Sequence, residues 1–278
     1  MFIDTHCHLD MILLFPQQER VLDDKDLPAI GEIITRAQKQ QVATIINVGC
    51  NIISSYNSLF LAQKFTNVFA TVGLHPTECN VGWQKEFAEL KELIAKSSQS
   101  KLVAIGEIGL DYYHKPYNSQ MQKDALMAQI ELALSLDLPV SLHVREAGDD
   151  ILKLIEPYRK NNLRGVMHCF QQSASFAKTA TDWGFYLGVD GPIDYPKNQG
   201  LRDIFKNVGL QHLILETDAP FLPPQAFRGK PNEPAYVPYI AQALAEIFAT
   251  SPGVIADVTT QNAEQLFKIA NFNHEGNL

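Results

Sequence analysis

The sequence predicts an α/β protein folded as a single (β/α)8 TIM barrel with additional C-terminal helices. Eight short β-branched or apolar runs alternate with longer amphipathic stretches along the 278 residues, and this alternation is typical of a parallel sheet covered by helices. No Gly-x-Gly-x-x-Gly motif follows the first run, which disfavours the alternative of an open Rossmann-type sheet. No linker divides the chain, so we expect one domain over residues 1–278 with its core at about 2–270.

The strands are expected, in chain order, at Phe2–Cys7, Val42–Val48, Val68–Gly73, Leu102–Ile108, Pro139–Val144, Gly165–Cys169, Phe185–Val189 and His212–Thr217. Helices are expected between them, for example at Ala29–Gln40, Trp83–Lys96 and Gln120–Leu136. In the third of these helices, Leu126, Ile130 and Leu134 recur at the spacing of one helical face. Helical periodicity returns at Tyr239–Phe248 and Val254–Ile269, which we interpret as helices that close the barrel.

Composition limits the possible functions. The chain has 46% hydrophobic and 19% charged residues, which excludes an intrinsically disordered protein. Its 23 Lys+Arg and 31 Asp+Glu give a net charge of −8, which argues against broad electrostatic capture of nucleic acid. A local cationic site built from metal ions remains compatible with this balance.

The four cysteines, at positions 7, 50, 79 and 169, form no Cys-x-x-Cys pair, which argues against a zinc ribbon or a thioredoxin-like motif. We expect reduced thiols in a cytoplasmic protein. The chain shows neither the pattern of a signal peptide nor a run of about 18 apolar residues. We therefore expect no membrane association.

A barrel places its chemistry where the strands end. His6 and His8 close the first strand and point to one side of it, while Cys7 points away. Such a pair suits a divalent metal, although two structural polar residues are an equal alternative. In the fourth strand, Glu107 lies between Gly106 and Ile108, where burying a carboxylate is unfavourable unless it is paired or metal-bound.

Three further strand ends carry similar groups. The fifth and sixth strands end with His143 and His168, and the eighth with Glu216 and Asp218 on one face. When two carboxylates lie this near to each other, the pKa of one of them rises unless a cation lies between them. The six candidate ligands are His6, His8, Glu107, His143, His168 and Asp218.

This set is too large for one tetrahedral ion. It is about right for two divalent ions that share a carboxylate, and Glu107, from the middle of the chain, is the natural bridge. Imidazole and carboxylate suit Zn, Mn or Mg without deciding among them. Asp111 has no clear role at this stage, and His114, His212 and His274 are less suggestive than the other histidines.

Other residues are candidates for contacts with substrate. His75 precedes Pro76 and is a candidate ligand, proton shuttle or phosphate contact, with a structural turn as the alternative. A long Pro- and Gly-rich loop follows the last strand, and loops at the active face are often functional. Its Arg228 and Lys230, together with Arg145 after the fifth strand, are candidate phosphate contacts, although a solvated loop is also possible.

Together these motifs resemble the TatD-like metal-dependent deoxyribonucleases, a branch of the amidohydrolase-type barrel superfamily. The segments that carry the resemblance are Asp4–Asp10, Gly73–Pro76, Gly106–Tyr112, Leu138–Pro139, His143–Ala147, His168–Phe170, Leu215–Pro220 and Arg228–Pro234. The chain departs from the family pattern at Gln171-Gln172 and over residues 188–198. Both departures lie near the expected rim, so they affect substrate preference and leave the ligands intact.

The resemblance implies that His6 and His8 hold one metal ion and that His143 and His168 hold a second. It implies that Glu107 bridges the two ions, whereas many related amidohydrolases use a carboxylated lysine. It also implies that Asp218 is both a ligand and the catalytic base.

We therefore expect a metal-dependent hydrolase of ester bonds, a deoxyribonuclease that cuts DNA from an end. Its substrate would be DNA ends or single strands, and no obligate protein partner is evident. Two alternatives remain. The same site would also suit a small amide or ester or a D-aminoacyl-tRNA, and activity on these without activity on DNA would choose it. The other alternative is a non-catalytic, metal-stabilised binding barrel, which metal-dependent turnover would dismiss.

Overall fold

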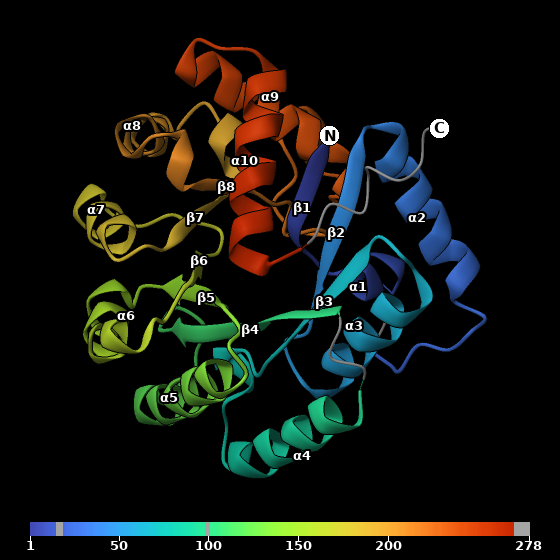
Figure 1. The fold of residues 1–278 in the computed structure, drawn as a ribbon, viewed down its shortest axis with the longest axis vertical. Coiled ribbons are helices and arrows are strands. Elements are labelled where there is room, and N and C mark those ends of the chain that lie inside the picture. Colours follow the sequence, from blue (N-terminus) through green and yellow to red (C-terminus); the bar gives the residue numbers. More distant parts are fainter. Residues whose placement is uncertain (15–18, 98–100, 270–278) are drawn as a thin grey trace.

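The computed structural model describes residues 1–14, 19–97 and 101–269. It confirms the TIM barrel, because eight parallel strands follow one another around a single sheet in chain order and helices ring the sheet (Figure 1). The strands are β1 Phe2–Cys7, β2 Val42–Val48, β3 Val68–Val72, β4 Leu102–Asp111, β5 Val140–Arg145, β6 Gly165–Met167, β7 Tyr186–Val189 and β8 Leu213–Leu215. The helices are α1 Leu9–Leu14, α2 Leu27–Lys39, α3 Ile52–Lys64, α4 Trp83–Lys96, α5 Ser119–Ser135, α6 Gly148–Ile155, α7 Ala174–Asp182, α8 Gln199–Val208, α9 Val237–Phe248 and α10 Pro252–Phe267.

The predicted strands differ from the observed ones mainly at the end that carries the site. Strand β4 continues to Asp111, whereas β6 stops at Met167 and β8 stops at Leu215. Beyond these shorter strands, Cys169 and Asp218 have φ values of 46° and 55°. That left-handed conformation is incompatible with a strand, so the sheet ends before the residues that face the site.

The barrel closes where β8 meets β1. Cys7 and Ala219 form a parallel bridge, and the His8 N–H donates to the Ala219 carbonyl at 2.8 Å. Just below it, the Asp4 carboxylate accepts bonds from the N–H and the hydroxyl of Thr217 at 3.0 and 2.7 Å. Burial raises the pKa of Asp4 to about 7. This seam brings the two histidines of β1 next to Asp218.

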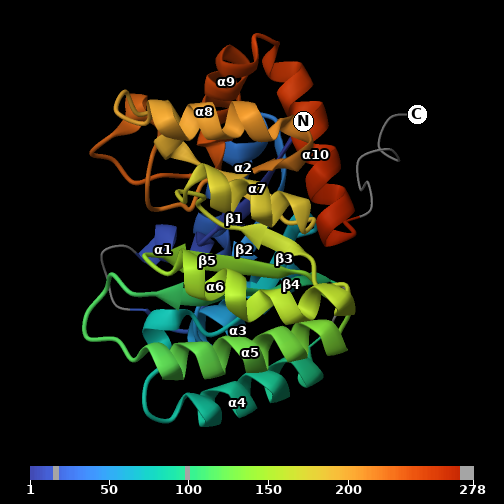
Figure 2. The ribbon, with the colours of Figure 1, turned by 90° about the vertical axis from the view of Figure 1, so that its left-hand side faces the viewer.

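The opposite, amino end of the barrel is apolar. Ile3, Ile46, Phe69, Val103, Val166 and Ile214, from six strands, form one cluster with Ala263, Leu266 and Phe267 of α10. Helix α10 lies on the other side of the barrel from α1, which follows the carboxyl end of β1 (Figure 2). The prediction that the last helices close the barrel is therefore confirmed for α10.

The predicted helices agree closely with the observed ones, and Trp83–Lys96 is observed with the same bounds. His274 and residue 270, the expected end of the core, lie outside the described residues. No helix within the described part of the chain is long and apolar enough to cross a membrane.

Candidate metal centre

A cavity of about 730 Å3 opens at the carboxyl end of the barrel. Its walls contain five of the six predicted ligands, namely His8, Glu107, His143, His168 and Asp218. The sixth, His6, is fully buried, and its Nε2 atom lies 3.4 Å from Glu107 Oε2. The fold thus brings together side chains from β1, β4, β5 and the segments after β6 and β8.

Asp218 faces the histidines of the barrel seam. Its Oδ1 atom lies 3.5 Å from His8 Nε2, 3.5 Å from His168 Nε2 and 3.8 Å from His6 Nε2. The ligand-capable atoms of His6, His8 and Asp218 all lie within 4.8 Å of one another. Three donors at this separation are compatible with one shared ion.

Glu107 occupies the middle of the cluster. Its Oε1 atom lies 2.8 Å from His143 Nδ1 and 3.8 Å from His168 Nε2, whereas its Oε2 atom faces His6. The β4–β5 register shifts between Ile105 and Ile108, so Glu107 lies in an irregular part of its strand. The two oxygens of this carboxylate therefore face two different sets of histidines, as expected for a bridge between two ions.

A second layer of groups orients the histidines. His8 Nδ1 lies 3.2 Å from the Val48 carbonyl, to which it donates, and this leaves Nε2 toward the cluster. His143 Nε2 lies 3.0 Å from Asp111 Oδ2. Such outer partners fix the ring orientation of metal-binding histidines. The structure thus assigns Asp111, whose role the sequence left open, to the support of His143.

Glu216 supports His168 from the other side. Its Oε1 atom lies 2.9 Å from His168 Nδ1 and accepts the Cys169 N–H at 2.6 Å. A side chain at Gly188 would place its Cβ 2.3 Å from this oxygen, so the position requires glycine. The sequence suggested that a cation separates Glu216 from Asp218, but the His168 ring lies between them.

The electrostatics favour bound cations. Burial opposes ionisation of Glu107, yet His75 and His168 hold its pKa well below the usual range. Burial likewise lowers the pKa of His8, but Asp218 and Glu107 outweigh it and leave that pKa raised. A potential that holds protons on imidazoles also holds metal ions in their place.

One further observation indicates that these imidazoles and carboxylates suit divalent ions. His6 Nε2 is buried and has no hydrogen-bond partner, and buried polar atoms rarely remain unpaired in folded proteins. Imidazoles and carboxylates are the ligands that Zn and Mn accept in catalytic sites. An ion beside Glu107 Oε2 would satisfy the orphaned nitrogen.

Two cysteines reach the cavity, which the sequence analysis did not anticipate. The expected strand Gly165–Cys169 would point Cys169 away from the site by strand alternation, but Cys169 lines the cavity. That expectation is wrong because the φ of 46° at Cys169 breaks the alternation. Cys50, which the sequence analysis left without a role, also lines the cavity, and its Sγ atom lies 3.4 Å from Glu107 Oε2.

Comparison with known proteins shows the family. The family model for TatD related DNases matches residues 3–268. The chain belongs to this family. The "Uncharacterized metal-dependent hydrolase YabD" of Bacillus subtilis is 35% identical over 269 residues, which are 97% of this chain and 100% of that protein. The "3'-5' ssDNA/RNA exonuclease TatD" of Salmonella typhimurium is 32% identical over 86% of this chain and 92% of its own length.

Solved structures agree with this assignment. YJJV, a TatD homologue from Escherichia coli, superposes with a TM-score of 0.85 at 31% identity, covering 96% of this chain and 98% of its own. A TatD family hydrolase from Entamoeba histolytica, at 23% identity, shares the fold with a TM-score of 0.82. The protein is therefore a metal-dependent hydrolase of the TatD family.

The predicted substrate contacts of this TatD family member divide into two groups. His75 and Arg145 line the cavity. His75 Nε2 lies 3.5 Å from Glu107 Oε1, close enough to group with the metal ligands. Arg228 and Lys230 are exposed and lie outside the cavity wall, among the residues described.

The loop that carries these two basic residues is anchored by Asn232. This side chain is fully buried and donates to the carbonyls of Thr217 and Phe221, each at 2.7 Å. Asn232 lies within the Arg228–Pro234 segment that resembles the family, but the sequence assigned it no role. No signal in the sequence marked this role, because an Asn in a Pro- and Gly-rich loop is ordinarily exposed.

His114 also lines the cavity, although its loop position made it look unimportant. Its Nδ1 atom lies 2.8 Å from Asp111 Oδ2, the oxygen that also faces His143. Asp111 therefore accepts contacts from two histidines at the rim. The three-residue spacing of Asp111 and His114 in the sequence was the signal for this contact.

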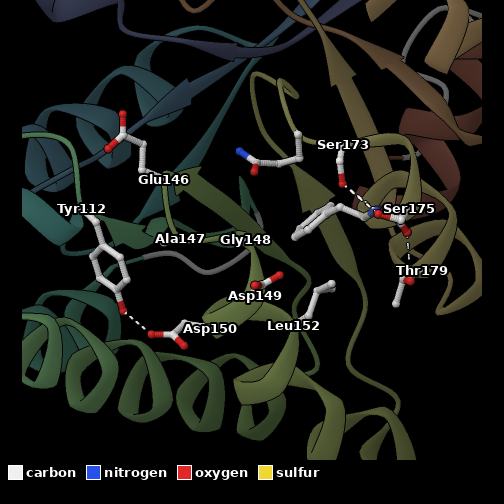
Figure 3. Close-up of a pocket in the computed structure, with 12 residues that line it drawn as sticks. Tyr112, Glu146, Ala147, Gly148, Asp149, Asp150, Leu152, Ser173, Ser175 and Thr179 are labelled. Atoms are coloured by element: carbon white, nitrogen blue, oxygen red, sulfur yellow. Dashed lines mark hydrogen bonds between the residues drawn. The ribbon is translucent and has the colours of Figure 1, made fainter.

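A second cavity, of about 520 Å3, lies between α6 and α7 (Figure 3). Its lining includes Tyr112 and Glu146, which directly follow Asp111 and Arg145. It also includes the carboxylates of Asp149 and Asp150. Tyr112 donates to Asp150 across one side, as drawn in Figure 3. These carboxylates make this side of the rim unfavourable for a polyanion.

Proposed function

We propose that this protein is a deoxyribonuclease that hydrolyses phosphodiester bonds at DNA ends or in single strands. Two divalent ions would be held by His6, His8, Glu107, His143, His168 and Asp218. The observation that carries the proposal is the position of Glu107, whose two oxygens face different histidines at 2.8 and 3.4 Å. Similarity to the exonuclease of Salmonella typhimurium supports the substrate class.

The chain's own groups define the chemistry. Divalent ions at this centre would supply positive charge to a phosphodiester and lower the pKa of an attacking water toward about 7. Asp218 would hold that water and accept its proton. Burial opposes ionisation of Asp218, but His168 and His8 keep its pKa below the usual range, so the group is present as the carboxylate, the form that binds a cation or takes up a proton.

The size of the cavity favours a single nucleotide over a duplex. A volume of about 730 Å3 lies within the range of pockets that enclose one small ligand, roughly 300–1,000 Å3. Phe221 lines the wall and is 46% exposed, which suits stacking against a nucleobase. The terminal nucleotide would enter here, with its phosphate on the metal centre.

The rest of the strand would follow the basic side of the rim. His75 and Arg145 would contact the reacting phosphate, and Arg228 and Lys230 would contact phosphates further along. Arg228 lies over the buried Tyr195 ring at 4.7 Å, so this contact would position the guanidinium charge for the strand. The acidic cavity between α6 and α7, whose lining includes Glu146 next to Arg145, would limit how far the strand spreads on that side.

The cysteines support a cytoplasmic location as part of this proposal. Cys7, Cys50, Cys79 and Cys169 are all free thiols, as expected in a reducing environment.

The test is release of nucleotides from end-labelled single-stranded DNA, with blunt duplex and single-stranded RNA in parallel. Protein stripped of metal receives Mg2+, Mn2+ or Zn2+, and Glu107→Ala is compared with Asp149→Ala, a carboxylate change in the second cavity. Metal-dependent release by the wild type and by Asp149→Ala, but not by Glu107→Ala, is the expected result. The labelled end gives the polarity.

Absence of release with every metal would overturn the nuclease assignment. The same preparations are then assayed on small esters and on D-aminoacyl-tRNA. Activity there that disappears in Glu107→Ala would keep the metal centre and replace the substrate.

A further inference from the structure

Cys50 places a sulfur atom on the edge of the metal centre. It follows Gly49, just beyond the carboxyl end of β2, and its Sγ atom lies 3.4 Å from Glu107 Oε2 and 4.0 Å from His8 Nδ1. The ligand-capable atoms of His8, Cys50 and Glu107 all lie within 4.8 Å of one another. The sulfur thus approaches the oxygen of Glu107 that also faces His6.

The backbone holds this thiol in a fixed position relative to Glu107. The Cys50 N–H donates to Ser54 Oγ at 2.8 Å, and the Cys50 carbonyl accepts the His75 N–H at 2.7 Å. One residue earlier, the Gly49 carbonyl accepts the Glu107 N–H at 3.1 Å. The segment that carries the sulfur is therefore tied directly to the strand that carries the bridging carboxylate.

The distances suit two ligands of one ion. Zinc binds sulfur at about 2.3 Å and carboxylate oxygen at about 2.0–2.2 Å, so a tetrahedral ion separates the two by about 3.5 Å. The observed separation of Sγ and Oε2 is 3.4 Å. A second observation concerns the same oxygen, because His6 is fully buried and its unpartnered Nε2 lies 3.4 Å from Glu107 Oε2, where it groups with His168 and not with Cys50.

We propose that Cys50 is a thiolate ligand of the metal position beside Glu107 Oε2, and that it makes this centre prefer zinc to magnesium. When the ion binds, the sulfur–hydrogen bond breaks, a sulfur–metal bond forms and the proton leaves to water, with no change of oxidation state. Soft thiolate ligands select zinc, whereas magnesium takes oxygen ligands. A thiolate ligand thus favours zinc, whereas imidazole and carboxylate ligands alone do not decide which metal binds.

Cys169 is the competing sulfur, because its Sγ atom groups with possible ligand atoms of His168 and Asp218. Contacts with Asp190 Oδ2 at 3.0 Å and Gln171 Nε2 at 3.2 Å engage this thiol. Cys79 Sγ contacts the Leu74 and His75 carbonyls and lies outside the cavity wall. Cys79→Ser is therefore a matched control, and Cys169→Ser tests the competing sulfur.

The experiment uses the whole protein loaded with Co2+, whose near-ultraviolet charge-transfer band reports sulfur ligation and whose visible bands report binding itself. We expect the charge-transfer band in the wild type, in Cys79→Ser and in Cys169→Ser. Cys50→Ser should lose that band and keep the visible bands, because the histidines and carboxylates still bind the ion. Its Zn2+ affinity should fall at least about tenfold, with a smaller change for Mn2+.

The zinc-loaded wild type provides a test that needs no variant. Its X-ray absorption spectrum at the zinc edge should contain a sulfur shell at about 2.3 Å. A spectrum with only nitrogen and oxygen neighbours would overturn the proposal and leave Cys50 as a thiol that donates to Glu107. A charge-transfer band that survives in Cys50→Ser, or that disappears only in Cys169→Ser, would overturn it as well.

The proposal takes its metal centre from the proposed function but does not depend on the substrate. A protein that shows the sulfur shell but releases no nucleotides would retain Cys50 as a ligand and lose the nuclease assignment. A nuclease without the sulfur shell would do the reverse.

Discussion

The two ends of the same barrel are built from opposite chemistry. At the amino end, Ile3 of β1 packs with Phe267 of α10 in a cluster of apolar side chains. At the carboxyl end, only three residues further along β1, His6 is equally buried but has an unpartnered ring nitrogen. The surroundings of β1 thus change from apolar side chains to a candidate metal centre within three residues.

This difference shows where stability and function reside. Burying apolar surface stabilises the fold by about 25 cal/mol per Å2, and the amino end consists almost entirely of such contacts. The carboxyl end holds buried carboxylates and imidazoles that oppose folding unless ions or hydrogen bonds compensate. We therefore expect changes at the two ends to affect different measurements.

The largest effect is expected from Glu107→Ala. Both oxygens of this carboxylate face histidines, so its loss removes the shared ligand of both proposed ions. Metal-dependent hydrolysis should fall by more than the roughly 10²–10³-fold typical of removing one oxyanion donor. Release of labelled nucleotides checks this, and circular dichroism checks that the fold is retained.

Glu107→Ala should leave the metal-free fold intact, because it removes a carboxylate whose ionisation is opposed by burial. Full activity in this variant would contradict the bridging role. A variant that fails to fold would contradict the separation of function from stability between the two ends.

Phe267→Ala should produce the complementary result at the amino end. Phe267 is 3% exposed and packs under the barrel with Ile3 and Ile46. Truncating a buried Phe lowers the free energy of unfolding by about 3–5 kcal/mol. Urea denaturation measures this loss, while cobalt binding at the other end should be unchanged; weakened cobalt binding would show that the two ends are coupled.

The barrel and the grouping of the candidate ligands could be predicted from the sequence for a physical reason. Alternating strands and helices carry strong periodic signals, and His6, His8 and Glu107 stand at strand ends where buried polar groups are exceptional. The strands β1 and β2 were predicted with both bounds correct. These features depend on local pattern, which a single sequence displays.

The rest depended on backbone geometry that local pattern does not display. The left-handed φ values at Cys169 and Asp218 reverse the direction that strand alternation assigns to a side chain. The approach of Cys50 to Glu107 requires the register between distant strands. Asn232 acts through the carbonyls of Thr217 and Phe221, contacts that exist only once the loop has folded back.

A smaller effect concerns the pH dependence at the carboxyl end. Burial, with Glu216 adding to it, raises the pKa of Asp190 from its ordinary 3.8 to about 8. The folded protein therefore keeps a proton that the unfolded chain releases, and stability falls as pH rises between about 4 and 8. The slope is at most about 1.4 kcal/mol per pH unit for this group.

Asp190→Asn should flatten this dependence, because an amide does not titrate. Urea midpoints of chelator-treated protein, measured between about pH 5 and pH 8, check the difference. Identical slopes in the wild type and in Asp190→Asn would show that Asp190 is ionised when buried.

The smallest effect is expected at the amino end, where a carboxylate shifts in the opposite direction. Asp137 is exposed and contacts Lys268, which follows α10, and Arg164. Lys268 and Arg164 lower its pKa to about 2, so its contribution is present above about pH 4 and is lost as pH falls toward 2. Asp137→Asn should therefore lower the melting temperature only slightly, since exposed ion pairs are screened by solvent and salt. A loss as large as that of Phe267→Ala would mean that this ion pair, and not the apolar packing, holds α10 against the barrel.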